Sequence, residues 1–190
     1  VLLGAAVATF FNGSNFVVSK GNITQEAMPV ISQWANGWHG LDALLDLWNV
    51  VLGLALLFLS RCLGILYFIN NVSDAELLPR FRRRLMIESV CFVVFFVPFV
   101  IYVLLKDGFA VDAASGSIVM ESYKYLHNLM AMPWVLGLLL LGVVAVLFGL
   151  GRSILCSTYN KGIWFAGVGT VLAVLALLLT VGYNNTAYFP

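Results

Sequence analysis

Two charged residues, Arg61 and Glu88, lie inside stretches of sequence that are otherwise apolar. A charge within a membrane-spanning helix is costly, so it usually has a partner and often a function. One arrangement is an ion pair between Arg61 and Glu88 across two neighbouring helices. In the other, Arg61 extends to the membrane surface, about 12 Å away at Ile69, and Glu88 pairs with Arg84 one turn earlier. The second arrangement is favoured because both charges lie towards the same surface, and the first stays open.

The two histidines, His39 and His127, carry the side chain that commonly ligates haem or moves protons near neutral pH. Both lie at the borders of apolar segments, whereas haem held across a bundle takes axial ligands from inside it. Hydrogen bonding at the membrane surface is therefore the favoured role. Asp42 and Asp46 lie one turn apart ahead of an apolar run, where carboxylates complement the positive end of a helix. This position favours a structural role over paired acid–base catalysis.

The sequence excludes several other kinds of site. The cysteines show no CxxC spacing, and Cys62 and Cys91 lie inside apolar runs, so neither a disulfide scaffold nor a zinc site is expected. No phosphate-binding glycine loop, nucleophile elbow or HExxH pattern is present. A net charge of +1 lacks the concentrated basic face that nucleic-acid binding requires. We therefore assign no catalytic residue, no metal ligand and no cofactor-binding residue.

The elements that must position these residues are four long apolar runs. Hydrophobic residues make up 62% of the 190-residue chain and charged residues only 10%, far from the balance of a soluble domain. A helix of roughly 20 residues crosses a hydrocarbon core about 30 Å thick, which matches Leu47–Ile69, Leu85–Leu105, Met130–Leu150 and Gly162–Val181. The sequence therefore predicts an all-α, polytopic transmembrane bundle over residues 47–181. Segment 1–12 is interpreted as the truncated end of a preceding transmembrane helix, and the chain as an internal piece of a larger membrane protein.

Charge in the connecting segments predicts the orientation of the bundle. Lys and Arg are concentrated on the cytoplasmic side of membrane proteins. Six lie on one side, at positions 80, 82, 83, 84, 152 and 161, and three lie on the other, at positions 20, 106 and 124. The Arg-rich loop 70–84, with Arg80, Arg82, Arg83 and Arg84, is thus expected to face the cytoplasm. The outer side then holds the loop and helix entry 13–46, the loop 106–129 and the C-terminal segment 182–190.

Small residues predict which helices pack closely, because membrane helices associate where small side chains let their backbones approach. The third run carries Gly142, Ala145 and Gly149 on one face, and the fourth carries Gly162, Ala166 and Thr170. A short connection joins these two runs, so we expect them to form an antiparallel pair. Pro98 interrupts the second run and is expected to kink it, because proline lacks an N–H and clashes with the preceding turn.

Longer strings carry a resemblance to a known family. These are GAAVATFFNGSNFVVSKGNI, ISQWANGWHGLDALLDLWNVVLGLALLFLSRCLGILYFINN, MESYKYLHNLMAMPW and NKGIWFAGVGTVLAVLALLLTVGYNNTAYFP. Together they resemble subunit II of bacterial cytochrome bd quinol oxidase, in the version found in Bacteroides-like bacteria. The likeness covers nearly the whole chain. Since the family subunit has eight or nine spans, the resemblance implies that this chain starts late in the fourth and ends after the eighth.

The resemblance implies a complex in the bacterial inner membrane that oxidises quinol at the outer face, reduces dioxygen to water and generates a proton-motive force. Haem b and haem d are expected in the partner, subunit I, and none is assigned to this chain. Membrane lipids, a structural quinone and small accessory subunits are further candidate partners. Two alternatives remain open: a segment of a secondary transporter, which needs broken helices and polar midplane sites, or a structural subunit of another membrane complex.

Overall fold

The computed structural model describes residues 1–18, 32–112, 116–182 and 185–187 of the chain. Its α-helices are α1 (Leu2–Asn12), α2 (Leu47–Asn71), α3 (Leu77–Leu105), α4 (Lys124–Ala131), α5 (Pro133–Leu155) and α6 (Gly162–Gly182). A 3-10 helix (Leu41–Leu45) precedes α2. The strands are β1 (Phe16–Val18), β2 (Ser32–Trp34), β3 (Gly108–Val111), β4 (Ile118–Glu121) and β5 (Thr186–Ala187). Lys20, which counts towards the predicted orientation, lies outside the described residues.

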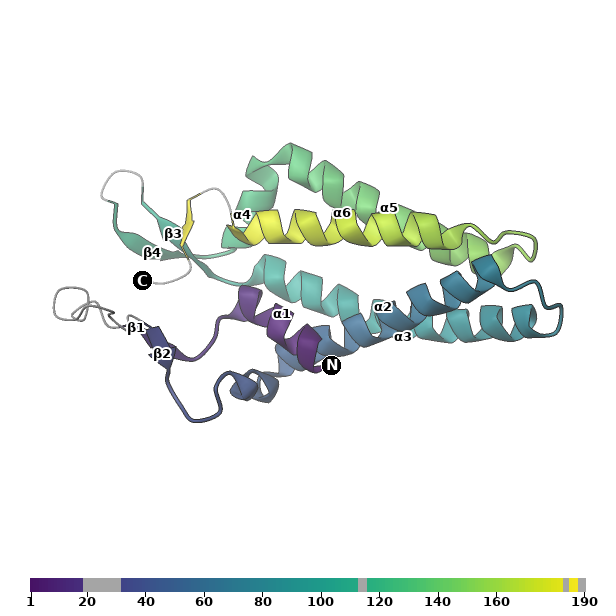
Figure 1. Ribbon diagram of the computed structural model, residues 1–190. Helices are drawn as coiled ribbons and strands as arrows, with labels where there is room; N and C mark the ends of the chain where they lie inside the picture. Colours follow the sequence, from purple (N-terminus) through teal and green to yellow (C-terminus); the bar gives the residue numbers. More distant parts are fainter. Residues whose placement is uncertain (19–31, 113–115, 183–184, 188–190) are drawn as a thin grey trace, which may run out of the picture.

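Four helices, α2, α3, α5 and α6, are long and apolar enough to cross a membrane, and α1 is a shorter apolar helix. The predicted helical membrane bundle is therefore confirmed, and 72% of the described residues are helical. Figure 1 shows α5 and α6 side by side along one layer, with α2 and α3 forming the other. We call the end with the α2–α3 and α5–α6 connections the loop end. The opposite end, with α4 and the strands, is the sheet end.

Two predicted boundaries need correction. The segment 70–84 is mostly helix rather than loop, because α3 begins at Leu77 instead of Leu85 and includes the arginines. Arginine is a good helix former whose long side chain reaches water from a helical backbone. The third span begins at Pro133 instead of Met130, with Met132 in a non-helical conformation between α4 and α5. Proline suits the first position of a helix and disfavours helical backbone in the residue before it.

Small antiparallel sheets at the sheet end form a part of the fold that the sequence did not predict. β1 pairs with β2, placing Phe16 opposite Trp34. β3 is the middle strand of a three-stranded sheet, with β4 on one side and β5 on the other. All five strands in the described residues lie in segments predicted only as outer loops. The pairing of β3 with β5 joins the connection after α3 to the residues that follow α6 (Figure 1).

The predicted antiparallel pair of the last two spans is confirmed as α5 and α6. A Cβ atom added to Gly142 would lie 2.6 Å from the backbone nitrogen of Ala173, and one added to Gly149 would lie 2.6 Å from the Gly162 carbonyl oxygen. Only glycine permits backbones this close. Thr170 was wrongly placed in this contact row: Gly169 faces Gly142 instead, and the Thr170 hydroxyl donates to the carbonyl of Ala166.

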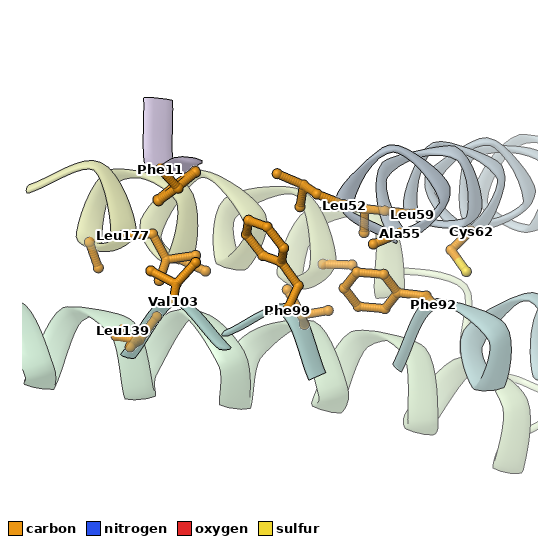
Figure 2. Packing of buried hydrophobic residues seen from close by; sticks show 14 of the residues in the cluster. Phe11, Leu52, Ala55, Leu59, Cys62, Phe92, Phe99, Val103, Leu139 and Leu177 are labelled. Atoms are coloured by element: carbon orange, nitrogen blue, oxygen red, sulfur yellow. The ribbon is translucent and has the colours of Figure 1, made fainter. Parts of the chain in front are cut away.

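Apolar side chains join the two layers into one core (Figure 2). Phe11 of α1 meets Phe99 of α3 edge to face, with ring centroids 5.6 Å apart. Leu139 of α5 and Leu177 of α6 belong to the same cluster. Helix α3 continues through Pro98, whose predicted kink stays a prediction. The core thus holds α1, α2 and α3 against the α5–α6 pair.

Candidate functional site

Arg61 and Glu88, the two charged residues within the apolar runs, meet at the loop end. An Arg61 Nη atom lies 2.7 Å from Glu88 Oε1, and Arg84 Nε lies 2.7 Å from the same oxygen. The Arg61–Glu88 pair that stayed open is therefore present, together with the Arg84–Glu88 pair of the favoured arrangement. The other half of the favoured arrangement, in which Arg61 extends to the membrane surface without Glu88, is wrong. Both pairs form because Glu88 points from α3 towards Arg61 of α2, while Arg84 lies one turn before Glu88 on the same face of α3. Sequence spacing identifies the second pair, but only the packing of α2 against α3 brings Arg61 to it.

The carboxylate of this cluster is buried, whereas its partners are not. The Glu88 side chain is 2% exposed, against 45% for Arg61 and 56% for Arg84. Its second oxygen, Oε2, is buried without a hydrogen-bond partner among the described residues. Next to Glu88 in sequence, the Ser89 hydroxyl lies 3.7 Å from the Cys62 sulfur. Taking a carboxylate out of water is costly unless cations and hydrogen bonds compensate it, so the two guanidinium groups stabilise Glu88 in place.

Arg82 has a different partner from its neighbours in the sequence. Its guanidinium donates to the carbonyl oxygen of Ser153 in the last turn of α5 and to that of Cys156, which follows the helix, at 2.9 Å. Two further bonds reach the Ser157 and Tyr159 carbonyls, at 2.8 and 3.0 Å. The last carbonyls of a helix lack intrahelical donors and carry partial negative charge. Arg82 therefore ties α3 to the end of α5.

The remaining two residues of the predicted arginine group, Arg80 and Arg83, are exposed. The group that the sequence treated as one orientation signal thus divides by partner: a carboxylate for Arg84, helix-end carbonyls for Arg82 and the surroundings for the other two. The spacing to Glu88 singles out Arg84 in the sequence. No sequence signal separates Arg82 from Arg80 and Arg83, because that division depends on which side of α3 faces α5.

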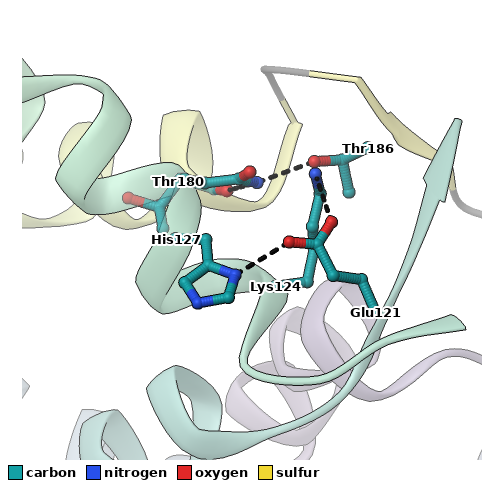
Figure 3. Close-up of polar contacts among 6 residues, drawn as sticks. Glu121, Lys124, His127, Thr180 and Thr186 are labelled. Carbon is teal, nitrogen blue, oxygen red and sulfur yellow. Dashed lines mark hydrogen bonds and ion pairs between the residues drawn. The ribbon is translucent and has the colours of Figure 1, made fainter. Parts of the chain in front are cut away.

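The sheet end carries a second ion-pair cluster, built from β4 and α4 (Figure 3). Glu121 accepts from Lys124 Nζ at 3.1 Å, and its other oxygen lies 2.8 Å from His127 Nδ1. Hydrogen bonds from His127 and Lys124 lower the pKa of the Glu121 carboxyl. The Lys124 side chain is buried, at 7% exposed, whereas that of Glu121 is 36% exposed. His127 thus has the hydrogen-bonding role that its position predicted.

Asn128, on the same short helix, is a structural residue that the sequence pattern did not identify. It is fully buried, and its amide donates to the Thr180 carbonyl of α6 at 2.9 Å and to the Thr186 hydroxyl of β5 at 2.7 Å. These bonds fasten α4 to the end of the last span. An asparagine within an apolar stretch was the only available signal, since buried polar groups need partners.

The carboxylates ahead of α2 have structural roles, as predicted. Asp46 caps the helix by accepting from the backbone N–H groups of Trp48 and Asn49, at 2.8 and 3.1 Å. Asp42 accepts from the side-chain amides of Asn15 and Asn36, and these bonds lower the pKa of its carboxyl. Both acceptors are thereby engaged in shaping the entry to the first complete span.

Lys106, immediately after α3, contacts the end of α1. Its Nζ donates to the Phe11 carbonyl at 3.0 Å and to the Asn12 side-chain oxygen at 3.3 Å. Burial lowers the pKa of this amino group. A cation at a helix C-terminus is favourable, so Lys106 does for α1 what Arg82 does for α5.

Haem is the cofactor to test against these residues. Both histidines lie at the sheet end, outside α2, α3, α5 and α6, and His127 Nδ1 is engaged with Glu121. His39 is exposed and has a left-handed backbone, with φ of 50°. Within the described ranges, no group of three or more His, Cys, Asp or Glu residues is placed to hold a metal ion. The histidines of this chain therefore do not fit an axial role for haem inside the bundle.

Four membrane-length helices with ion pairs at both ends define a polytopic helical membrane protein. The family model for cytochrome bd terminal oxidase subunit II matches residues 1–190, so the chain belongs to that family. It is accordingly a multi-pass inner-membrane subunit of a bd-type terminal quinol oxidase, a haem-containing respiratory complex in which subunit I is its partner. No curated protein matches the chain.

Proposed function

We propose that this chain supports the haem-bearing subunit of the oxidase and supplies no reacting group itself. The family match over residues 1–190 carries the proposal. The positions of the two histidines support the proposal, because both lie outside the spans. We therefore expect haem b and haem d to take their ligands from subunit I. The complex would oxidise quinol at its outer face, reduce dioxygen to water and generate a proton-motive force, while this chain contributes the packed helices that hold subunit I.

The complex itself is the material for testing this function. Purified with both subunits, it should show haem d in reduced-minus-oxidised spectra and consume oxygen when given quinol. Replacing His127 with glutamine, which keeps a hydrogen-bonding side chain, should leave the haem spectrum unchanged. A complex without haem d and without quinol-dependent oxygen uptake would refute the proposal, and a haem signal lost in the His127 variant would place a ligand on this chain.

We further propose that the loop end faces the cytoplasm and the sheet end the outer side. The exposed arginines Arg80 and Arg83 at the loop end support this orientation, because short-loop cations are retained inside. A label that cannot cross the membrane should react from outside with cysteine introduced at Ser117 but not with cysteine at Arg83. Native Cys156 lies beside Arg82 at the loop end and is an internal control. Reaction at Arg83 alone would reverse the orientation.

The transporter alternative gains no support from the fold, because α2, α3, α5 and α6 are each continuous helices. We assign the structural quinone that the resemblance suggests to the apolar cavity between these helices. It has a volume of about 300 Å³, and its lining includes Phe92, Val100, Val146 and Ala173. Apolar walls of this kind accommodate a hydrocarbon chain and offer no group for redox chemistry.

A further inference from the structure

The charged cluster at the loop end has an uncompensated positive charge. Arg61 and Arg84 share one carboxylate, Glu88, so the three residues together carry a net charge of +1. Both guanidinium groups are about half exposed, and neither has another partner in the described part of the chain. Glu88 lies behind them, buried, so a molecule approaching from the membrane meets the guanidinium groups rather than the carboxylate. The cluster therefore attracts an anion.

The position of the cluster indicates where that anion comes from. Arg84 lies two residues, about 3 Å along the helix axis, from Arg82, which contacts the carbonyls at the end of α5. The end of α5 marks one border of the apolar layer, and lipid headgroups begin at that border. Arg61 starts deeper in its helix, but its guanidinium reaches the same Glu88 oxygen and hence the same level. Phospholipid phosphates lie at this level around the whole protein.

The surface beside the guanidinium groups suits a lipid. Gly64, one turn from Arg61 on α2, has open space where a side chain would be. On the exposed side of α3, Ile87 is 46% exposed and Val90 60% exposed, deeper in the membrane than Arg84. A headgroup can thus bind at the arginines while its acyl chains lie along apolar residues.

We propose that Arg61 and Arg84 together bind the phosphate group of an anionic membrane phospholipid. The bonded nitrogens of the two guanidinium groups lie within 2.7 Å of one oxygen, so they are no further apart than twice that distance. One phosphate can bridge two guanidinium groups so placed, through charge-assisted hydrogen bonds. The negative charge of the lipid neutralises the cluster. This inference depends only on the helices crossing a membrane, and it stands apart from the oxidase activity.

The test uses the purified two-subunit complex, titrated with phosphatidylglycerol, with bound lipid counted by native mass spectrometry. The double variant Arg61→Gln/Arg84→Gln should bind phosphatidylglycerol at least about tenfold more weakly, the effect of losing one or two charge-assisted hydrogen bonds. Because that variant leaves Glu88 uncompensated and can fail to fold, Arg61→Gln/Glu88→Gln/Arg84→Gln is measured as well, with the same expected loss. Arg80→Gln/Arg83→Gln, which removes two exposed charges at the same end, is the matched control and should bind normally.

Each other outcome overturns the inference in a recognisable way. An equal loss of phosphatidylglycerol binding in the control variant would mean that the lipid is attracted to the basic surface as a whole. Unchanged lipid binding in the triple variant would mean that Arg61 and Arg84 do not form the site. Loss of subunit I from the triple variant would indicate a partner carboxylate as the missing anion. Competition by millimolar inorganic phosphate as strong as that by the lipid would assign the site to free phosphate, and equal binding of zwitterionic phosphatidylcholine would remove the role of net charge.

Discussion

Each end of the bundle carries a cluster of carboxylate and cationic side chains, but the two clusters bury opposite charges. At the loop end a carboxylate, Glu88, is buried beneath two half-exposed arginines. At the sheet end a cation, Lys124, is buried beneath a carboxylate, Glu121, that is 36% exposed. Each end therefore presents to its surroundings the charge opposite to the one it buries. The loop end becomes positive at its surface, in line with the proposed orientation, and the sheet end carries an exposed carboxylate.

Both ends also use a cation to complete a helix terminus, Arg82 for α5 and Lys106 for α1. Arginine, with several donors in a plane, reaches four carbonyls, whereas the Lys106 ammonium reaches two oxygens. The difference concerns these two termini alone, because at the sheet end Asn128 also joins α4 to Thr180 and Thr186 through side-chain hydrogen bonds. The backbone hydrogen bonds between β3, β4 and β5 also connect elements at the sheet end.

The largest loss of stability is expected when the buried carboxylate at the loop end loses both of its arginine partners. Replacing both Arg61 and Arg84 with leucine leaves Glu88 as a buried uncompensated charge, which should cost about 3–5 kcal/mol of folding free energy. Additional Glu88→Leu should restore most of it, because the buried charge is then gone. Thermal unfolding of the complex measures both variants. A double variant as stable as the parent would mean that Glu88 is not buried as an ion.

A smaller effect is expected at the helix terminus held by Arg82. Arg82→Gln should lower the free energy of unfolding by about 2 kcal/mol, since hydrogen bonds from a charged donor to the α5 carbonyls are lost. Arg82→Lys should recover part of this, because a point charge still faces the helix end. Arg83→Gln, an exposed neighbour, serves as the control. If Lys106→Gln lowers the free energy of unfolding more than Arg82→Gln does, the conclusion that Arg82 holds its helix end more strongly than Lys106 is wrong.

The smallest effect is expected at the exposed carboxylate of the sheet end. Hydrogen bonds from His127 and Lys124 lower the pKa of Glu121 below its ordinary value of 4.5. The stabilisation is therefore complete above that value and is lost as pH falls through the lowered folded-state pKa. Because Glu121 is near the surface, its share is only about 0.5 kcal/mol. Glu121→Gln should remove the part of the thermal stability that is lost as pH falls below 4.5, and an unchanged profile would exclude the pairing.

Much of the helical architecture was predictable from residue types alone. The lengths and composition of the apolar runs determine that α2, α3, α5 and α6 cross a membrane, since no other structure satisfies their backbone in lipid. The small residues around Gly142 and Gly149 likewise indicate the close α5–α6 pair. The strands were not predictable from local pattern. β5 is two residues long and exists only because β3 lies beside it.

For the candidate site, residue types and spacing were enough to identify Arg61 and Glu88 as costly charges in need of partners, and to place Arg84 one turn from Glu88. That both arginines meet one carboxylate oxygen, and that Arg82 contacts α5, became known from the folded chain alone. The physical reason is that spacing along a helix sets which residues share a face. Which neighbouring helix that face meets depends on packing across the whole bundle, through contacts between residues far apart in the chain.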